Sequence, residues 1–520
     1  MTPTVTELLL ARAEDRSTGL LFEDRRWTWA EHVRACAGHA AALAAILRPG
    51  GHFGLLADNV PEFSFLLGGA ALSGRVLVGL NPTRRGAALA RDVALADCEL
   101  VFAEEKYLPL LSDTDVPVLP LSELEPAREA ADPVAAKPED LLMLIFTSGT
   151  SGDPKAVRCT HGKIAYPGEM LATRFGLSTE DTVYVSMPMF HSNAIMAGWS
   201  VGLAAGAGIA VRRRFSASGF LPDIRKFGAT YANYVGKPLS YVLTTPERDD
   251  DADNPLKLVY GNEGAEADLA AFGTRFGCHV VDAFGSTEGG VNFGRDATTP
   301  AGSLGRLLDG VAVLDPETGK PCPPAEFDEG GRLLNAAEAV GELVNTGGPG
   351  FFAGYYGDPA AEAERMRGGM YHTGDLAYLD ADGYCYFAGR LGDWLRVDGE
   401  NLGTAPIERA LLRHPAVSEA AVYGVPDPRV GDQVMAALVC RSPIDADELA
   451  AFVVAQGDLG PKQWPRFVRV LDALPRTATH KVLKRNLAAD GSSAAWELRY
   501  PRVQSSECGS SRWQLPHSEG

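Results

Sequence analysis

The chain has 520 residues, of which 46% are hydrophobic and 22% charged, and its formal net charge is -19 at pH 7. This length exceeds one ordinary domain, and the composition is typical of a globular protein rather than a disordered or fibrous one. The acidic balance argues against a general nucleic-acid-binding protein, which would carry a basic face, but a local site can still be positive. Eight cysteines without a C-x-x-C pair indicate a reducing compartment, and we expect a cytoplasmic protein.

In the first 390 residues, short apolar runs alternate with helical stretches rich in alanine and leucine. The runs are GHFGLLAD, RVLVGLN, CELVFAE, LLMLIFTSG, TVYVSMP and AGIAVRR. This alternation is typical of α/β architecture with mainly parallel sheets flanked by helices. Within it, residues 310–344 form short segments rich in glycine and proline, which predict a small β-rich subdomain.

Residues 192–211 are a run of twenty uncharged residues, and three arginines follow it. That length could span a bilayer, and the arginines fit the positive-inside pattern. The run contains four glycines and much alanine, so it is only weakly hydrophobic. We therefore predict a buried helix, a glycine turn and a buried strand.

The pattern beyond residue 392 is that of a smaller α+β unit. It contains the helical stretches APIERALLRH and DELAAFVVAQ and the strand-like runs SEAAVYGV, QVMAALVC and FVRVLDAL. The last thirty residues are rich in serine and arginine and lack periodicity. We predict a large N-terminal domain over residues 1–391, a small α+β C-terminal domain over 393–490, and a poorly ordered tail over 491–520.

The segment FTSGTSGDPKAV (146–157) has the features of a phosphate-binding loop. It follows an apolar run, so it lies at the carboxyl end of a strand, where α/β sheets bind ligands. Its hydroxyl groups, its flexible backbone N–H groups and its lysine suit an anion. It does not match the Walker A pattern, because Asp153 and Pro154 separate the second glycine from the lysine. On composition alone, a flexible turn is an equally good interpretation. The candidate phosphate-binding residues are Thr147, Ser148, Gly149, Thr150, Ser151, Gly152 and Lys155.

This loop and five later segments together resemble the signature of the adenylate-forming (AMP-binding) superfamily. Residues 147–157 match the superfamily loop [ST]-S-G-[ST]-[ST]-G-x-P-K-[GA]-V at every defined position. The later segments, in the order of the family, are MPMFHSNA, DAFGSTEGG, YHTGDL, GRLGDWLRVDGENLGTAPIE and PRTATHKVLKR. The segments YGNEGAEADL and GDWLRVDGEN look most like the fatty-acid-transport-protein branch of very-long-chain acyl-CoA synthetases.

The resemblance implies an ATP-dependent fatty acid–CoA ligase that uses ATP, Mg²⁺ and CoA. Because a carboxylate is a poor electrophile, such an enzyme joins it to AMP, releases pyrophosphate, and then transfers the acyl group to the CoA thiol. The alternatives are an acyl-AMP ligase that serves a carrier protein, and a fatty-acid uptake or binding protein with vestigial activity. The expected partners are small molecules, with no nucleic acid and with peripheral membrane contact for a lipid substrate; the oligomeric state is left open.

Individual roles follow from the same resemblance. Glu288 is expected to bind Mg²⁺ through a hard carboxylate oxygen, and Thr287 to contact the α-phosphate. Phe284 is expected to stack on adenine, the alternative being a core aromatic residue. His191 is expected at the gate between the nucleotide and the acyl pocket, the alternative being a satisfied core histidine. The remaining candidates for nucleotide binding in these segments are Glu263, Gly264, Asp282, Gly285 and Ser286.

The C-terminal motifs supply the other expected site residues. Asp375 should accept hydrogen bonds from the ribose hydroxyls, and Arg390 should reach the ribose or phosphate unless it forms only a surface ion pair. Lys481 should bridge the carboxylate and the α-phosphate during adenylation. Motif spacing selects Lys481 over Lys484, although His480 stands where the family usually has glycine.

Two glycines in this part of the chain are expected to have roles in the rotation of the C-terminal domain and in CoA binding. The resemblance implies a mobile C-terminal domain with its hinge at Gly392 and with Gly399 close to the pantetheine arm of CoA. The alternative for both glycines is an ordinary turn.

Overall fold

The computed structural model describes residues 2–129, 132–148, 154–295, 298–300, 302–329, 331–391, 395–397, 400–427, 431–476, 482–492 and 495–500. Tertiary contacts divide the chain into two compact units. The larger unit comprises Met1–Pro321, Glu342–Gly374 and Asp382–Tyr386, and the smaller one comprises Cys322–Gly341, Asp375–Ala381 and Phe387–Gly520. The hinge predicted at Gly392 lies outside the described residues, so the domain boundaries proposed from the sequence stay a prediction.

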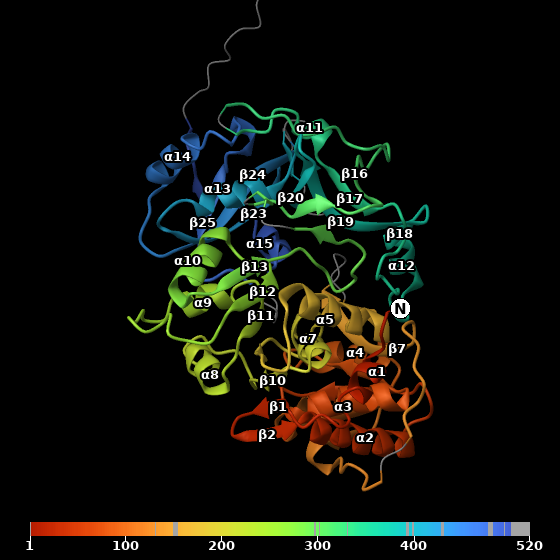
Figure 1. The fold of residues 1–520 in the computed structure, drawn as a ribbon. Helices are drawn as coiled ribbons and strands as arrows, with labels where there is room; N and C mark the ends of the chain where they lie inside the picture. The colour runs from red at the N-terminus through yellow and green to blue at the C-terminus, as the bar shows by residue number, and fades with distance from the viewer. Residues whose placement is uncertain are drawn as a thin grey trace, which may run out of the picture. The chain divides into compact units, whose positions relative to one another are not determined.

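A six-stranded sheet in the larger unit carries the phosphate-loop segment, with the strand order β6-β5-β3-β4-β7-β8. Neighbouring strands are parallel except for the hairpin β7–β8. The central strands β3, β4 and β7 are largely apolar because helices cover both faces: α4 lies on one side, and α3, which packs against α2, lies on the other (Figure 1). The elements are α1 (Val5–Leu10), α2 (Trp29–Ile46), β3 (His52–Leu56), α3 (Pro61–Ser73), β4 (Val76–Gly79), α4 (Gly86–Leu95), β5 (Cys98–Ala103), η1 (Glu105–Leu111), β6 (Val118–Pro120), η2 (Leu121–Glu123), β7 (Leu141–Ser148) and β8 (Pro154–Thr160).

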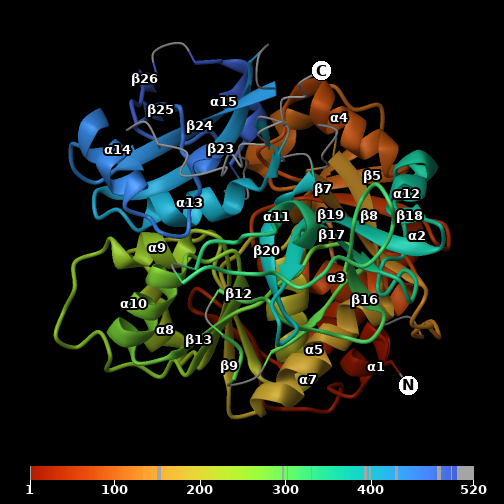
Figure 2. The ribbon, with the colours of Figure 1, turned by 90° about the horizontal axis from the view of Figure 1, so that it is seen from above.

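A second sheet in the same unit has seven strands in the order β13-β12-β11-β9-β10-β1-β2, and all neighbours are parallel except β1–β2. Helices α8, α9 and α10 share an apolar core with it and lie together in Figure 2. The strands are β1 (Thr18–Phe22), β2 (Arg25–Thr28), β9 (Thr182–Val185), β10 (Gly208–Val211), β11 (Tyr231–Val235), β12 (Leu258–Asn262) and β13 (His279–Asp282). The helices are α5 (His161–Phe175), α8 (Phe220–Phe227), α9 (Pro238–Leu243) and α10 (Glu266–Phe276). The predicted α/β class with mainly parallel sheets is confirmed.

The uncharged run at 192–211 is buried, as predicted. It forms α6 (Ser192–Ala194), the π-helix η3 (Ile195–Trp199), α7 (Ser200–Ala205), a turn at Gly206 with φ 71°, and strand β10. No helix among the described residues is long and apolar enough to cross a membrane. The π-helix was not predicted; such segments are rare and recur at functional sites.

A third sheet accounts for the predicted β-rich subdomain. Antiparallel pairs within it include β16–β17 and β14–β15, and Gly305 and Arg306 of β15 pair with Cys385 and Tyr384 of β20. Its elements are β14 (Phe293–Gly294), β15 (Gly305–Leu307), β16 (Val311–Leu314), α11 (Ala336–Ala339), β17 (Gly341–Asn345), α12 (Pro359–Arg365), β18 (Met366–Arg367), β19 (Met370–Leu379) and β20 (Tyr384–Arg390).

The C-terminal part of the smaller unit is the predicted α+β structure, with β24 between an antiparallel β23 and a parallel β25. One prediction is wrong: the poorly ordered tail does not begin at residue 491, because β26 pairs with β25 and Leu498 is buried in the core. The elements are β21 (Leu395–Val397), β22 (Glu400–Leu402), α13 (Thr404–Leu412), β23 (Val417–Asp427), β24 (Gly431–Cys440), α14 (Ala446–Val454), η5 (Pro461–Gln463), β25 (Phe467–Val470), α15 (Lys484–Ala489) and β26 (Trp496–Glu497). Residues 501–520 of the predicted tail lie outside the described residues.

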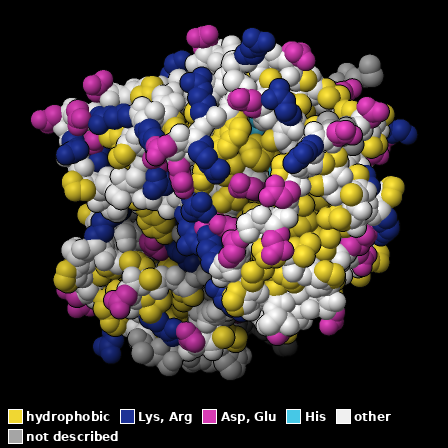
Figure 3. Space-filling view, turned by 90° about the horizontal axis from the view of Figure 1, so that it is seen from below, with side chains coloured by type: hydrophobic (Ala, Val, Ile, Leu, Met, Phe, Trp, Pro, Cys, Tyr) yellow, Lys and Arg dark blue, Asp and Glu magenta, His cyan; other side chains and the backbone are white. Residues whose placement is uncertain are grey.

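Acidic and basic side chains are interspersed with apolar ones over the face of the molecule shown in Figure 3. Many of the charged groups are paired, as in the ion pairs Lys226–Asp24 and Arg225–Asp250 of the larger unit. Exposed pairs of this kind contribute little to stability, so the buried charges are more informative about function.

Candidate active site

The β7–β8 hairpin presents the ends of the phosphate loop. Thr147 and Ser148 end β7, and in the antiparallel register they lie opposite Lys155 and Pro154 at the start of β8. Lys155 is buried; its Nζ lies 5.2 Å from the centroid of the Tyr355 ring and 3.7 Å from a carboxylate oxygen of the exposed Glu364. Gly149, Thr150, Ser151 and Gly152 lie outside the described residues, as does the side chain of Ser148, so their phosphate contacts stay a prediction.

Glu288 lies beside this hairpin with one carboxylate oxygen fixed by the protein. Its Oε1 accepts hydrogen bonds from the Tyr355 hydroxyl at 3.0 Å and from Thr147 Oγ1 at 3.5 Å. Both donors are neutral, so no cation of the protein bonds to this carboxylate among the described residues. Carboxylate oxygens are the hard ligands that Mg²⁺ takes in proteins.

Tyr355 is itself held by a half-buried arginine. The Arg365 Nε donates to the Tyr355 hydroxyl at 3.3 Å, and Arg365 Nη1 donates to the carbonyl oxygens of His372 and Thr373. Burial and the charge of Glu288 raise the pKa of Tyr355. The hydroxyl therefore stays protonated and acts as the donor to Glu288.

Lys163, in the first turn of α5, holds the backbone of Glu288. Its Nζ donates to the Glu288 carbonyl oxygen at 2.9 Å and approaches the Arg158 carbonyl oxygen at 3.4 Å. The side chain is almost completely buried, and burial lowers the pKa of Lys163. Glu288 is thus held at its carbonyl and at its carboxylate by different parts of the larger unit.

The two glycines after Glu288 are required by close packing. Gly289 has φ 70°, a left-handed conformation that favours glycine. A Cβ on Gly290 would lie 2.1 Å from the Tyr371 ring. The motif therefore ends in glycines because any larger residue would displace the loop that carries Glu288.

Ser192, the residue after His191, forms a hydrogen bond with Thr287. The Ser192 and Thr287 hydroxyl oxygens are 2.8 Å apart, so the residue after His191 is tied to the candidate α-phosphate contact. The His191 ring lies against Phe190 with centroids 4.4 Å apart, and its buried Nε2 has no hydrogen-bond partner among the described residues. Burial lowers the pKa of His191 to about 4, so the imidazole is neutral near pH 7. This nitrogen is unsatisfied, which argues against the core-histidine alternative.

The candidate adenine segment is organised by Asp282. Its Oδ1 accepts hydrogen bonds from the Gly264 N–H at 3.1 Å and from the Tyr234 hydroxyl at 2.5 Å, and burial raises the pKa of Asp282. Glu263, just before this contact, has φ 63°, which is uncommon for a residue other than glycine. Asp282 therefore holds the segment in shape, and its predicted contact with the nucleotide stays a prediction.

Phe284, Gly285 and Ser286 form the turn that leads to Thr287. Phe284 is half-buried and meets Phe293 edge-to-face, with centroids 5.2 Å apart. Gly285 and Ser286 are exposed, and a Cβ at Gly285 would have open space around it. Because the Phe284 ring is half-buried and the neighbouring Gly285 is open to solvent, both alternatives for Phe284 stay open: stacking on adenine and packing as a core aromatic residue.

The smaller unit contains the candidate ribose site. Arg390 Nε lies 3.5 Å from Asp375 Oδ1, so these two predicted residues are paired. In the larger unit, Gly374 donates its N–H to the buried Glu342 at 3.0 Å, which fixes the backbone of strand β19 just before Asp375. Gly399 and Lys481 lie outside the described residues. Lys484, which the motif spacing rejected, forms an ion pair with Glu408 at 2.8 Å.

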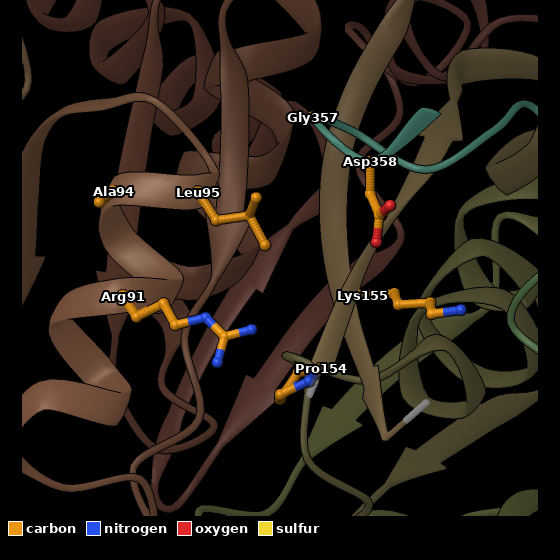
Figure 4. Close-up of a pocket in the computed structure, with 7 residues that line it drawn as sticks. All are labelled: Arg91, Ala94, Leu95, Pro154, Lys155, Gly357 and Asp358. Carbon is orange, nitrogen blue, oxygen red and sulfur yellow. The ribbon is translucent and has the colours of Figure 1, made fainter. Parts of the chain in front are cut away.

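A cavity of about 450 Å³ opens beside Lys155 in the larger unit. Figure 4 shows Arg91 and Leu95 extending from α4 on one side, and Pro154, Lys155 and Asp358 on the other. The cavity combines two cationic side chains with one carboxylate, and it lies on the hairpin that carries the phosphate loop.

Sequence reasoning missed the residues that hold the site together. They are Lys163, Ser192, Tyr234, Glu342, Tyr355 and Arg365. The run FFAGYYGDP, between two recognised motifs, could have drawn attention to Tyr355. Lys163 has no such signal, because a single lysine in a helix is usually solvated.

The fold is that of adenylate-forming enzymes. The structure of O-succinylbenzoate CoA synthetase (MenE) from Bacillus subtilis in complex with ATP and magnesium ion superposes with a TM-score of 0.79. The two sequences are 27% identical, and the match covers 93% of this chain and 99% of the other.

The chain belongs to the AMP-binding enzyme family. The model of that family matches residues 10–356, and the model of the AMP-binding enzyme C-terminal domain matches residues 406–481. The predicted superfamily is therefore confirmed.

Similar curated proteins are named as ligases and transport proteins. Medium/long-chain-fatty-acid–CoA ligase FadD17 of Mycobacterium marinum is 56% identical, covering 96% of this chain and 99% of that protein. Steroid-22-oyl-CoA synthetase of Rhodococcus jostii is 45% identical, covering 93% and 90%. Long-chain fatty acid transport protein 2 of Rattus norvegicus, from the branch expected on motif grounds, is 31% identical, covering 92% and 84%.

Proposed function

We propose that this chain is an ATP-dependent fatty acid–CoA ligase that forms acyl-AMP and pyrophosphate and then acyl-CoA. The observation that carries the proposal is the setting of Glu288, whose carboxylate is fixed by neutral donors beside the phosphate-loop hairpin. Membership of the AMP-binding family and 56% identity to a protein named as a medium/long-chain-fatty-acid–CoA ligase support it.

The residues present fit a magnesium ion delivered with ATP. The described residues contain no cluster of three or more His, Cys, Asp or Glu side chains, and Mg²⁺ commonly needs only one or two carboxylates besides substrate phosphates. Glu288 would hold the ion through its carboxylate. When bound, Mg²⁺ neutralises phosphate charge as pyrophosphate leaves.

The chain's own residues would divide the remaining work. The loop from Thr147 to Lys155 cradles the β- and γ-phosphates through hydroxyl and backbone N–H donors, and Thr287 contacts the α-phosphate. Phe284 stacks on adenine, with Glu263, Gly264, Asp282, Gly285 and Ser286 along its edge. Asp375 binds the ribose hydroxyls, Arg390 reaches the ribose or the phosphate, and His191 lies at the gate between the nucleotide and the acyl pocket.

The smaller unit is proposed to supply the catalytic lysine. Lys481 stabilises the charge that develops between the carboxylate and the α-phosphate. Lys481→Ala should abolish pyrophosphate release and leave thioester formation from supplied acyl-AMP intact. Equal rates of both half-reactions in the variant and the wild type would overturn this role; Lys484→Ala is the matched control.

An acid panel tests the proposed function. Purified protein is incubated with ATP, Mg²⁺, CoA and acids from short to very long chains, with aromatic and steroid acids included, and pyrophosphate and acyl-CoA are measured separately. We expect both products with medium or long chains. Pyrophosphate release with acyl-AMP accumulation and no acyl-CoA would favour the acyl-AMP ligase, and fatty-acid binding without pyrophosphate release would favour the uptake protein.

A steroid acid is the second candidate substrate. It is favoured by the 45% identity to the protein named as a steroid-22-oyl-CoA synthetase. Turnover of a steroid acid with a higher kcat/KM than any fatty acid in the panel would select it.

We further propose a cytoplasmic location, because the described cysteines are all free, as in a reducing compartment. Peripheral contact with a membrane would give access to a lipid substrate. Vesicle flotation of the purified protein with and without a fatty acid tests this contact, and recovery of all the protein in the unbound fraction would contradict it.

A further inference from the structure

One buried amine joins the three parts of the larger unit that meet at Glu288. Lys163 begins helix α5 directly after strand β8, the second strand of the phosphate-loop hairpin. Its Nζ lies 2.9 Å from the Glu288 carbonyl oxygen and 3.4 Å from that of Arg158 in β8. The amine thus links the helix, the strand and the loop that carries the candidate metal ligand.

The stability of the fold does not explain why a lysine stands here. Lys163 is only 4% exposed, and among the described residues its Nζ donates to backbone carbonyl oxygens and forms no ion pair, although the charge of Glu288 acts on it at longer range. Burying an amine without an anionic partner costs free energy, and an apolar residue of similar size is often at least as stabilising. A geometric role accounts better for the lysine.

The hairpin and the Glu288 loop are joined at two points. Thr147 of β7 donates to the Glu288 carboxylate, and Lys163, beside β8, donates to the Glu288 carbonyl. With both ends of Glu288 held, the position of its carboxylate relative to strands β7 and β8 is set by the protein before any ligand arrives.

We propose that Lys163 is a positioning residue that fixes Glu288 relative to the β7–β8 hairpin. This rests on the proposed function, because the metal-ligand role of Glu288 gives the positioning its purpose. Removing a residue that hydrogen-bonds to a metal-ligating residue and orients it typically lowers metal affinity or activity by about 10- to 100-fold. Lys163 acts through Glu288 and touches no reacting atom.

The test replaces the amine by a thioether of similar length. Lys163→Met removes the donor, and Lys137→Met makes the same change at an exposed lysine. Three quantities are measured on the full chain: calorimetric affinity for ATP across a magnesium titration, rates of the two half-reactions, and Tm. We expect Lys163→Met to weaken Mg²⁺-dependent ATP binding about 10-fold or more. Its Tm should stay within about 3 °C of the wild type.

Measuring the two half-reactions separately distinguishes a loss of Glu288 positioning from a general loss of folded structure. Adenylation should fall with the affinity, whereas thioester formation from supplied acyl-AMP, which releases no pyrophosphate, should match that of Lys137→Met. Unchanged magnesium dependence in Lys163→Met would overturn the proposal, as would an equal loss in both half-reactions accompanied by a large fall in Tm. If the wild type turned over no acid, the proposed function would fail, and the binding titration alone would still decide the role of Lys163.

Discussion

Two carboxylates in the larger unit, Asp58 and Glu288, are both surrounded by protein donors, but the donors differ. Asp58 accepts hydrogen bonds from Lys106 at 2.5 Å, from Arg214 at 3.0 Å and from Tyr107 at 2.7 Å. Glu288 accepts hydrogen bonds from Tyr355 and Thr147, while Lys163 bonds to its carbonyl oxygen instead of its carboxylate.

The difference in donors indicates that Asp58 is a structural carboxylate and that Glu288 is a candidate metal ligand. Burial pulls the pKa of Asp58 upward, but the bonds from Lys106, Tyr107 and Arg214 outweigh it, so the pKa lies below its ordinary value. The charge of Asp58 is thus neutralised within the protein. The Glu288 carboxylate accepts hydrogen bonds only from neutral hydroxyl groups among the described residues, so no ion pair with the protein occupies it there, and it can serve as a ligand for a hard cation.

Replacing Glu288 should give the largest effect. Glu288→Gln keeps the shape and removes the charge, so we expect adenylation to fall about 100-fold, as on loss of a preorganised electrostatic group. Added Mg²⁺ should restore only part of the rate, and Tm should change little. The rate of pyrophosphate release over a series of magnesium concentrations measures this loss. If Glu288→Gln had the kinetics of the wild type, Glu288 would not be a metal ligand and would not differ in role from Asp58.

The matching change at Asp58 should affect stability and not activity. Asp58→Asn leaves Lys106 and Arg214 without their shared anion, and we expect a loss of about 2 kcal/mol, or about 3 to 6 °C in Tm. Differential scanning calorimetry measures the shift. A large fall in the rate of adenylation per folded molecule would show that Asp58 is not merely structural.

Removing the Tyr355 hydroxyl should have a smaller effect. In Tyr355→Phe the Glu288 carboxylate loses one neutral hydrogen bond, worth about 1 kcal/mol, so KM for magnesium–ATP should rise about fivefold with kcat less affected. Steady-state kinetics over an ATP series measure the split. The control is Tyr166→Phe, the same change at an exposed tyrosine. If KM for magnesium–ATP rose equally in both variants, Tyr355 would have no special role at the site.

The smallest effect concerns pH. Because the pKa of Asp58 is lowered in the folded protein, its stabilising contribution is complete above the ordinary value of about 3.9 and is lost as the pH falls through the lower, folded value. The difference in Tm between the wild type and Asp58→Asn should therefore stay constant from pH 6 to about pH 4 and then shrink toward pH 3. A constant difference over this range would contradict the ion-pair interpretation.

Much of the fold could be predicted from local patterns. Apolar runs such as LLMLIF and TVYV, bounded by glycine or polar residues, form β7 and β9 because a strand buried on both faces must be apolar throughout. The tail prediction failed at residues 495–500, because Trp496 and Leu498 are held by pairing and packing with distant residues. Composition alone does not reveal such contacts.

The sequence by itself determined the family and the order of the motifs, and it predicted which residues face the substrates, because a phosphate loop or a metal ligand is expected to depend on short, contiguous chemistry. Tertiary structure alone decided what holds Glu288. Its contacts come from Thr147, Lys163 and Tyr355, which are 141, 125 and 67 residues away along the chain. No local periodicity marks such residues, since they are brought to Glu288 only when the sheet, helix α5 and the following loops pack together.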